Sequence, residues 1–538
     1  MKIKNFNISK LRNVAFIGLF LFSSSSCLND LDVRVDDDEL FTSEQFYANP
    51  ASYKQFLAKI YAGLAVTGQS SNAGTGSSDL GSEADGGPNE GFSQYLRGYW
   101  QMQELTTDEA IIAWGESDNP TIRDLNFNTW NADNVFNEAF FARLFFQVGL
   151  VNEFLRETTD EKLSSRGVSE ELKGEIKTFR AEARFLRALT YYHAIDLYGK
   201  MPFATENDAL GTKPVMQSRQ FMFDYVISEL NAIEGELPAP KMNEYGRADK
   251  AAVWMLKSKL FINGKVYTGT DKSTEALAEV EKVIGSAYKV AQIPYADLFK
   301  ADNNTNGAQD EIIFPINFDG IRTKTYGGTT YLIHASCTNE VGTTLGIDFG
   351  WQGFRVRQEF MNSVGSDQRV MKVAGNTDPA FISDYSKFEQ GTKLIKFSNK
   401  TSSGANGQDA NFTDADFPVF RMADAYLMYA ELAVVNGKGS VATALNYINA
   451  LRTRGGVATV SQTALNKDFI LSERARELYW EGYRRQDLIR FDKYLAGYNW
   501  QWKGGSVNGN NLPESRLLFP IPNKYLNLNR NLTQNPGY

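Results

Sequence analysis

The chain has 538 residues, of which 42% are hydrophobic and 22% charged, as expected of a folded globular protein. Its net charge of −8, without any basic stripe, argues against binding to nucleic acid, whose phosphates require clustered Lys and Arg. Two cysteines and two histidines are too few for a structural zinc site. There is no Walker loop, no GxSxG elbow and no nucleophile motif beside His193 or His334, so both histidines are expected to be packed or surface residues.

Residues 1–26 predict a secretory signal peptide. Basic residues are followed by an apolar run from Val14 to Phe22, too short for a membrane span, and then by four serines. Cys27 directly after these small residues predicts a lipoprotein, in which the chain is cut before the cysteine and its thiol is acylated, for instance with palmitate. Because Ser24 replaces the usual leucine, an ordinary signal peptide with an incidental cysteine stays open. Residues 27–39 are acidic and predict a solvated tether.

Helices are predicted wherever apolar residues recur at helical spacing, as Phe136, Phe140 and Leu144 do. His193 falls in such a run, whereas the run that ends at His334 reads as a strand. A Gly/Ser/Asp-rich loop is predicted for residues 67–98. The predicted helices are residues 40–66, 135–156, 175–198, 218–236, 248–267, 274–286, 419–436, 440–454 and 466–495.

Neighbouring predicted helices are joined by short turns and carry small residues where they would cross, which resembles tetratricopeptide helix pairs. The region of about 288–416 differs, because it is rich in Gly, Asn, Thr and aromatic residues with short strand-like pieces. The sequence therefore predicts a mainly α protein with one domain over 40–538. Its helical scaffold would span about 40–287 and 417–500, with a loop-rich insertion at about 288–416, where binding residues are expected.

Several segments along the mature chain together resemble the SusD/RagB family of Bacteroidetes surface lipoproteins. They are residues 179–188 (FRAEARFLRA), 196–203 (DLYGKMPF), 246–252 (GRADKAA), 420–426 (FRMADAY), 477–488 (ELYWEGYRRQDL), 520–522 (PIP) and 529–538 (NRNLTQNPGY). The resemblance implies a SusD-like fold, no enzymatic activity and a lipid-anchored position on the outer face of the outer membrane. It also implies a partner, a SusC-like TonB-dependent porter. Glu477, Glu481 and Asp487 in these segments are expected to pair with arginines between helices.

The segments 107–109, 326–332 and 502–505 are most similar to the starch-binding founding member of the family. The resemblance implies an arc of aromatic residues that holds the glycan. Such rings offer flat apolar platforms for the C–H face of a sugar, and polar side chains can bond to its hydroxyls. Carried over, the arc falls on Trp114, Tyr326 and Trp351, and the polar partners on Arg97 and Asp85.

Two departures from the family pattern lie beside this expected site. Ile112 stands where a tryptophan is expected, and Ser117 replaces a sugar-binding asparagine, with Asp118 and Asn119 next to it. All three residues at 117–119 are kept as candidate glycan contacts. The departures leave open which sugar is bound, and burial of the aromatic residues in the core is the alternative to a binding role.

The resemblance further suggests calcium at Asp414, Asp416 and Asn304, since carboxylate and amide oxygens are the ligands that calcium takes. A solvated loop with a helix N-cap is the alternative, and no other cofactor is expected. The implied function is capture of starch or maltooligosaccharides and delivery to the porter. Open alternatives are another polysaccharide, a glycoside hydrolase, which would need two carboxyl groups around the bond, and a tetratricopeptide adaptor for proteins.

Overall fold

The chain divides into two compact units, residues 1–52 and 53–538. In the first unit, helix α2 (Ser43–Tyr47) begins at a capping box in which Thr42 and Gln45 exchange side chain–backbone hydrogen bonds. Helix α3 (Ala51–Ala62) contains the boundary between the units. The predicted signal peptide, Cys27 and tether lie outside the described residues. The computed structural model describes residues 42–68, 77–82, 88–117 and 119–538.

The second unit is mainly helical, and its long helices start where the sequence supplies an N-cap. Before α6, α8 and α9, the side chains of Asn134, Ser169 and Ser218 each accept the backbone N–H three residues on, which satisfies a free donor of the first turn. The long helices are α6 (Val135–Glu157), α8 (Glu170–Leu197), α9 (Arg219–Ile233), α10 (Lys250–Ile262), α12 (Ser273–Ile284), α16 (Met422–Val434), α17 (Val441–Arg454) and α18 (Lys467–Leu478).

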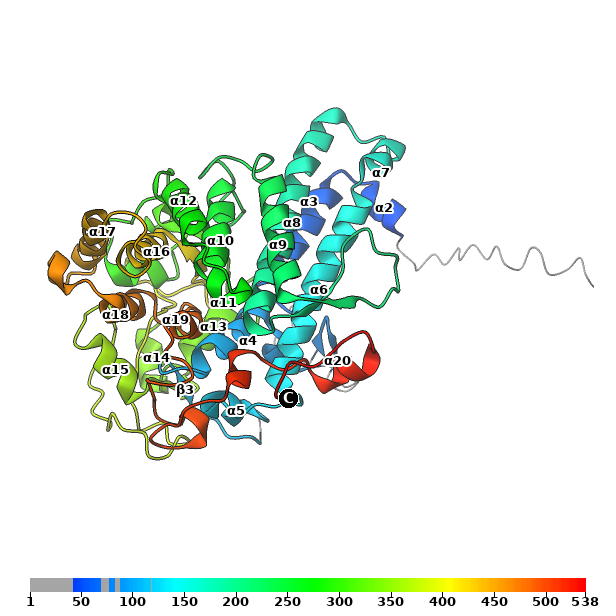
Figure 1. The fold of residues 1–538 in the computed structure, drawn as a ribbon. Coiled ribbons are helices and arrows are strands. Elements are labelled where there is room, and N and C mark those ends of the chain that lie inside the picture. The colour runs from blue at the N-terminus through cyan, green and yellow to red at the C-terminus, as the bar shows by residue number, and fades with distance from the viewer. Residues whose placement is uncertain (1–41, 69–76, 83–87, 118) are drawn as a thin grey trace, which may run out of the picture. The chain divides into compact units, whose positions relative to one another are not determined.

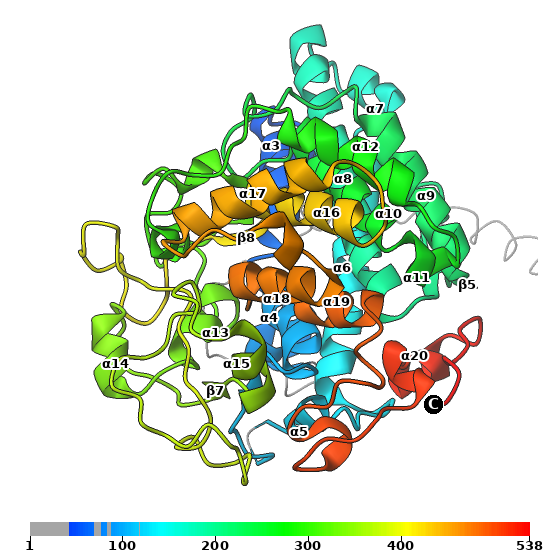
Figure 2. The same cartoon turned by 60° about the vertical axis from the view of Figure 1, so that its left-hand side comes forward.

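These helices pack side by side in a continuous row. Contacts link α6 to α8, α8 to α9, α9 to α10, α10 to α12, α12 to α16 and α16 to α17, and α18 packs on α16 (Figures 1 and 2). Each helix buries its apolar face against its neighbours, which is how helix-pair scaffolds form a core. The predicted mainly α fold built on packed helix pairs is confirmed.

The strands of the described residues are short and form four antiparallel pairs. In the pair β6–β8 every residue is buried, and the pair is followed directly by α16. The pair β3–β7 joins two segments that lie more than 240 residues apart in the sequence. The pairs are β1 (Ser77–Ser78) with β2 (Gly81–Ser82), β3 (Ile111–Ile112) with β7 (Phe354–Arg355), β4 (Met201–Phe203) with β5 (Val215–Gln217), and β6 (Ile312–Ile316) with β8 (Phe417–Arg421).

The loop-rich region contains more helix than its sequence indicates. The run ending at His334 belongs to helix α13 (Gly328–His334), so the strand prediction is wrong. Every residue of α13 is buried, so no one-sided apolar period marks it, and its aromatic and β-branched residues are typical of strands. Two further short helices of this region are α14 (Asn339–Thr344) and α15 (Gln358–Val364). The short helices elsewhere in the chain are α4 (Tyr95–Trp100), α5 (Ile122–Phe127), α7 (Asp160–Ser165), α11 (Gly264–Thr268), α19 (Arg484–Arg490) and α20 (Asn523–Leu528).

The helix predicted for residues 466–495 is interrupted between α18 and α19. Trp480 (φ 60°) and Gly482 (φ 82°) adopt left-handed backbone conformations, which a right-handed helix does not include. For a tryptophan this conformation is costly, and tertiary contacts hold it. The buried indole of Trp480 donates a hydrogen bond to the carbonyl oxygen of Glu109 at 2.9 Å.

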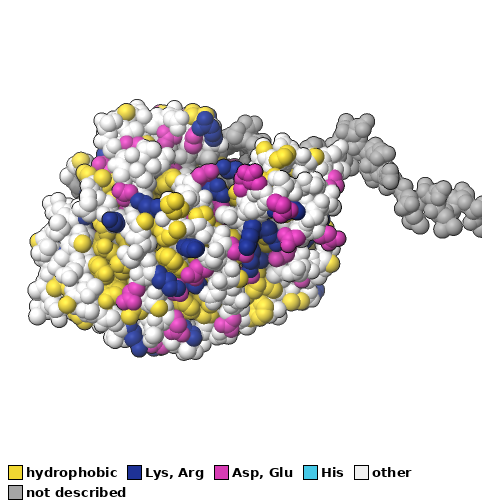
Figure 3. Space-filling view, turned by 90° about the horizontal axis from the view of Figure 1, so that it is seen from above, with side chains coloured by type: hydrophobic (Ala, Val, Ile, Leu, Met, Phe, Trp, Pro, Cys, Tyr) yellow, Lys and Arg dark blue, Asp and Glu magenta, His cyan; other side chains and the backbone are white. Residues whose placement is uncertain are grey.

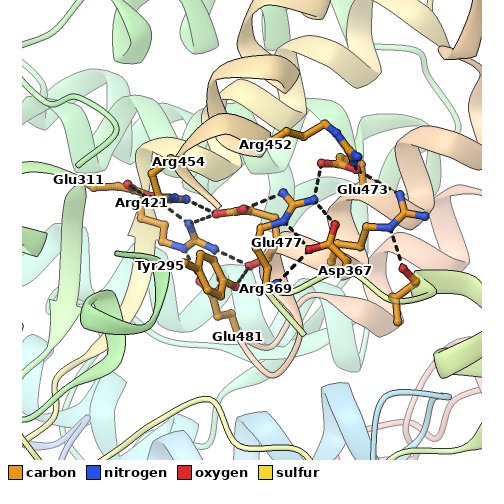
Figure 4. Close-up of polar contacts among 12 residues, drawn as sticks. Tyr295, Glu311, Asp367, Arg369, Arg421, Arg452, Arg454, Glu473, Glu477 and Glu481 are labelled. Carbon is orange, nitrogen blue, oxygen red and sulfur yellow. Dashed lines mark hydrogen bonds and ion pairs between the residues drawn. The ribbon is translucent and has the colours of Figure 1, made fainter. Parts of the chain in front are cut away.

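A buried charge network crosses the scaffold between α17, α18 and the β6–β8 pair (Figure 4). Arg421 contacts Glu311, Glu477 and Glu481 at 2.6–2.8 Å, and all four side chains are fully buried. Burial raises the pKa of Glu477, but the neighbouring arginines outweigh this and hold it well below its ordinary value. We call this set the buried charge network; its members are Glu311, Asp367, Arg369, Arg421, Arg452, Arg454, Glu473, Glu477 and Glu481.

The expectation that these motif carboxylates pair with arginines is confirmed. Glu477 and Glu481 belong to the buried charge network, and Asp487 contacts Arg474 and Arg490, each at 2.7 Å.

On the outside, Figure 3 shows positive and negative side chains interspersed with apolar patches on the face it draws. Within the described parts of the chain, none of the helices combines the length and apolar character needed to cross a membrane.

Candidate functional site

The pairing of β3 with β7 brings two of the predicted aromatic residues together. Trp114 follows β3 and Trp351 precedes β7, and the backbone N–H of Ala113 donates to the carbonyl oxygen of Gly353 at 2.9 Å. The indole Nε1 of Trp114 donates to the carbonyl oxygen of Trp351 at 3.1 Å. Their ring centroids lie 6.1 Å apart with planes inclined by 49°. A side chain at Gly353 would press on the Trp114 ring, so this close approach favours glycine.

Tyr326 is the third ring of the aromatic cluster, by which we mean Trp114, Tyr326 and Trp351. Its centroid lies 6.0 Å from that of Trp351 with the planes inclined by 61°. The carboxylate of buried Glu90 fixes the segment before α13, because it accepts the Tyr326 N–H at 3.2 Å and the Thr325 hydroxyl at 2.7 Å. All three rings of the aromatic cluster are half-buried, so the structure unites them at the surface of the loop-rich region and not in the core.

Arg97 lies against the inner side of the aromatic cluster. Its side chain is only 5% exposed, and its guanidinium carbon lies 4.2 Å from the Tyr331 ring centroid and 5.8 Å from that of Trp114. Its Nη1 donates to the carbonyl oxygen of Tyr326 at 3.0 Å, whereas its Nε has no hydrogen-bond partner among the described residues. Burial lowers the pKa of Arg97, and Tyr331 and Glu90 oppose that shift. The arginine thus supports the rings from beneath, and a contact with sugar hydroxyls stays a prediction.

Sequence reasoning missed further rings around the aromatic cluster. Phe412 packs on Tyr326 with centroids 5.5 Å apart, and Phe349, 39% exposed, lies 6.5 Å from Trp351. The imidazole of His334 stacks on Trp351 with centroids 4.8 Å apart and planes inclined by 26°. Since His334 has no motif beside it and its run resembles a strand, only the aromatic richness of this region indicated such a cluster.

The structure describes only some of the remaining candidate residues for sugar contacts, and it places them differently. Ser117 is exposed and Asn119 half-buried, and both follow Trp114 on the same loop, near the ion pair of Glu116 with Arg123 at 3.2 Å. Ile112 is fully buried in β3, so it contributes to the core and not to the exposed surface of the cluster. Asp85 and Asp118 lie outside the described residues.

The two carboxylates suggested as calcium ligands accept hydrogen bonds from the protein, although the buried Oδ2 of Asp416 has no hydrogen-bond partner among the described residues. The two carboxylate oxygens of Asp414 accept the N–H groups of Gly320 and Gln408, each at 2.7 Å, and Asp416 accepts that of Phe318 at 2.7 Å. Asn304 is exposed, and its neighbour Asn303 binds the backbone of residue 416 instead. Calcium takes six to eight oxygen ligands, and in the part of the chain that the structure describes no three His, Cys, Asp or Glu side chains gather as a metal site. Asp414 and Asp416 precede strand β8, whereas a helix was expected to follow them.

A buried pair of carboxyl groups, Glu104 and Glu109, has the perturbed acidity that active sites often show. Burial raises the pKa of Glu104 to about 7, and burial together with Glu104 raises that of Glu109. Glu104 is inaccessible and accepts the N–H of Gly482 at 2.7 Å, and Glu109, 2% exposed, accepts that of Trp480 at 3.1 Å. A glycosidase needs carboxyl groups that reach the substrate, so this pair serves the left-handed turn between α18 and α19.

A mainly apolar groove of about 710 Å³ lies between α6 and α20. Phe92, Phe141 and Leu528 line it, and its charged residues Glu138 and Lys524 pair with each other at 2.9 Å. A sugar presents a rim of hydroxyl groups that require polar partners, and this groove offers few. The aromatic cluster is therefore the better candidate for a glycan.

Comparisons with known proteins agree with this picture. The chain is 34% identical to the starch-binding protein SusD of Bacteroides thetaiotaomicron over 99% of both chains. It is 24% identical to the SusD-like protein P2 of Formosa agariphila over 77% of this chain and 83% of that protein. The profile of the SusD family matches residues 351–538.

Solved structures support the same fold. A SusD superfamily protein from Parabacteroides distasonis superimposes with a TM-score of 0.67 at 19% identity, covering 93% of this chain and 100% of that one. Surface glycan-binding protein A from Bacteroides thetaiotaomicron, in complex with laminarihexaose, gives a TM-score of 0.65 at 20% identity, covering 90% and 98%. Since the identity to a curated relative extends over nearly the whole length, this chain belongs to the SusD family of carbohydrate-binding proteins, which are not enzymes.

Proposed function

We propose that this protein captures α-glucan, as starch or maltooligosaccharides, on the aromatic cluster of Trp114, Tyr326 and Trp351. The observation that carries the proposal is the placement of three half-buried rings with successive centroids 6.1 and 6.0 Å apart and with inclined planes. Each ring offers a flat apolar surface to the C–H face of a glucose unit. Because the platforms are inclined to one another, they suit a curved chain such as a turn of an α-glucan helix better than a straight one.

The identity to a starch-binding relative supports α-glucan as the ligand class. The substitution at Ser117, with Asp118 and Asn119 beside it, favours testing a second ligand as well, since these side chains would set the hydroxyl contacts. Laminarihexaose, which accompanies a structural relative, is that second candidate.

Affinity electrophoresis of the purified protein with starch, pullulan, dextran, levan, xylan and laminarin tests the ligand class. Retardation by starch and pullulan, with no new reducing ends after incubation, is the expected result. Retardation by another polysaccharide alone would replace α-glucan, and release of reducing ends would contradict a pure binding role. Phe381→Ala is the matched control, because Phe381 is an exposed aromatic residue (43%) outside the cluster and its loss should leave retardation unchanged.

We further infer that Cys27 carries a lipid anchor that holds the protein on the outer face of the outer membrane. The inference rests on the position of this cysteine at the end of the predicted signal peptide. Cys27→Ala should move the protein from the membrane fraction to the soluble fraction. Continued fractionation with membranes would contradict the anchor.

The proposed partner is a SusC-like TonB-dependent porter that receives the captured glycan. The proposal rests on family membership and needs a binding test. Affinity purification of the full-length protein from detergent-solubilised membranes should recover a large β-barrel protein in a constant ratio. Its repeated failure to copurify would count against this partner.

A further inference from the structure

His334 occupies a position that the glycan-binding proposal does not use. The side chain is fully buried at the end of α13, and its imidazole stacks on Trp351. One face of the Trp351 ring is thereby covered, so the ring is supported from within the protein. The backbone carbonyl of His334 also accepts the N–H of Trp351 at 2.6 Å, and a side chain at Gly350 would collide with the carbonyl of Cys337. The Trp351 loop is therefore packed tightly on the end of α13.

Both nitrogens of the imidazole face backbone carbonyl oxygens on different segments. Nδ1 lies 2.7 Å from the carbonyl oxygen of Phe349, on the Trp351 loop, and Nε2 lies 3.0 Å from that of Asn411. Asn411 precedes Phe412, which packs on Tyr326. The one imidazole thus joins the segment that carries Trp351 to the segment that supports Tyr326.

A neutral imidazole cannot satisfy both carbonyls. It carries one N–H and one lone pair, so one of the two contacts would set a nitrogen lone pair against a carbonyl oxygen. A buried polar contact without a proton is unfavourable, whereas the imidazolium ion donates to both oxygens, and charge-assisted bonds are the stronger kind. The link between the two segments is therefore complete only when His334 is protonated.

The surroundings of His334 set the pH at which this occurs. Burial lowers its pKa, while the two carbonyls and Asp348 oppose the shift. On the second segment, Asp409 accepts the N–H groups of Asn411 and Phe412 and pairs with Lys324, and these contacts lower its pKa against its burial. Burial raises the pKa of Cys337 to about 12, so this thiol stays neutral. Of His334, Asp409 and Cys337, only the imidazole is expected to change its charge at mildly acidic pH.

We propose that His334 is a positioning residue of the glycan site, which ties the Trp351 loop to the segment of Asn411 and Phe412 and does so most firmly when protonated. The proposal rests on the glycan-binding function proposed above. The complete link is present below the pKa of His334 and is lost as the pH rises through it, and burial moves this pKa below its ordinary value. Glycan affinity should therefore increase as the pH falls below the ordinary range of histidine, near 6.5.

Calorimetry of the purified protein with maltoheptaose between pH 4 and 8 tests this dependence. One additional hydrogen bond predicts a rise in affinity of about threefold to tenfold at the acidic end. His334→Gln keeps one donor and one acceptor but cannot be charged, so its profile should be flat and should match the wild type only at high pH. His334→Phe keeps a ring against Trp351 without either bond, and it should bind more weakly at every pH.

Two variants serve as controls. His193 is the other histidine, and burial lowers its pKa to about 3, so His193→Gln should retain the wild-type pH slope. Asp348→Asn removes a charge that favours the imidazolium and keeps the size of the side chain, so it should move the rise to lower pH. Identical profiles for His334→Gln and the wild type would overturn the proposal, as would a wild-type affinity independent of pH.

A titration of the imidazole nitrogens by NMR separates this proposal from the proposed function. His334 should show two N–H signals below its pKa and one above it, and hydrogen exchange at residues 349–351 and 409–412 should slow as the second signal appears. If the wild type binds no glucan, the function fails while this readout still tests the link. If the imidazole remains neutral down to pH 4, the link fails while glycan binding can stand.

Discussion

The buried charge network and the aromatic cluster both place an arginine beside aromatic rings, yet they satisfy it differently. Arg421 lies 5.7 Å from the Phe299 ring and contacts three carboxylates. Arg97 lies 4.2 Å from the Tyr331 ring and donates to a backbone carbonyl, with no carboxylate ion pair among the described residues. In the first region each charged side chain has an ion-pair partner within the protein. In the aromatic cluster, some polar groups are only partly satisfied and the rings are half-exposed, so both can still contact a ligand.

This difference separates residues that specify the fold from residues that can bind. Matched buried charges fix the relative positions of the helices and offer nothing to solvent, whereas the cluster sits on loops that the scaffold holds in place. Substitutions in the network should therefore change stability without changing the glycan contacts, and substitutions in the cluster should do the reverse.

The largest effect is expected from Arg421→Met. Removing the guanidinium leaves Glu311, Glu477 and Glu481 with less compensation in the interior, and breaking a buried ion pair in this way costs about 3–5 kcal/mol. Urea unfolding followed by circular dichroism measures the loss. Arg322→Met is the matched control, because Arg322 is 78% exposed in its pair with Asp319 and the same change there should cost less than about 1 kcal/mol. Equal losses for the two variants would contradict the separation.

The next effect is the converse one, on binding alone. Truncation of a well-packed aromatic contact costs about 2 kcal/mol or more, roughly thirtyfold in affinity. Trp114→Ala combined with Trp351→Ala should therefore abolish detectable binding to starch by calorimetry, while the helical signal in circular dichroism is kept. Unchanged affinity would contradict the site assignment. A collapsed helical signal would show that these rings are core residues and would remove the contrast between the two regions.

Acid should also weaken a set of matched buried charges that lies outside the buried charge network. Lys259 and Arg474 contact buried Asp424 at 2.6 and 3.0 Å and, against the opposing effect of burial, lower its pKa to about 2. A lowered carboxylate pKa contributes stability above the pKa of the unfolded chain, near 3.9, and this is lost as the pH falls through the folded value. Asp424 should thus account for about 2–3 kcal/mol of stability that disappears between about pH 5 and 2.

The corresponding measurement is urea unfolding at a series of pH values for the wild type and for Asp424→Asn. The variant should be less stable at pH 7, and the difference between the two proteins should shrink in acid. A difference that stays constant from pH 7 to 3 would mean that the carboxylate is not held ionised by its partners.

The sequence predicted the scaffold better than the site, for a physical reason. Helices such as α12 and α17 bury one side, so their apolar spacing is visible in the chain. Helix α13 is buried on all sides and carries no such period, and the turn at Trp480 depends on contacts with Glu109, far away in the sequence. Tertiary contacts of this kind are not encoded in local spacing.

The residues of the aromatic cluster could be named from family resemblance, but their roles depend on burial. Trp114, Tyr326 and Trp351 come together as expected, although 237 residues separate the first from the last. Arg97 was expected to face sugar hydroxyls, and its chain position alone could not reveal that it is 5% exposed beneath the rings. His334 gave no signal, because its partners are backbone carbonyls that any sequence would supply.

The smallest expected effect, from Arg97→Lys, distinguishes the two roles for this arginine. Lysine keeps the charge but loses the planar stacking on Tyr331 and the fixed bond to the Tyr326 carbonyl, so starch affinity should fall about threefold to tenfold, near 1 kcal/mol. If Arg97 acts by supporting the ring of Trp114, the loss should largely vanish in a Trp114→Ala background, because the supported group is gone. If it bonds directly to hydroxyls, the loss should persist there, and a double-mutant cycle by calorimetry measures which holds. If the two losses of affinity are fully additive, Arg97 contacts the ligand directly and acts independently of Trp114.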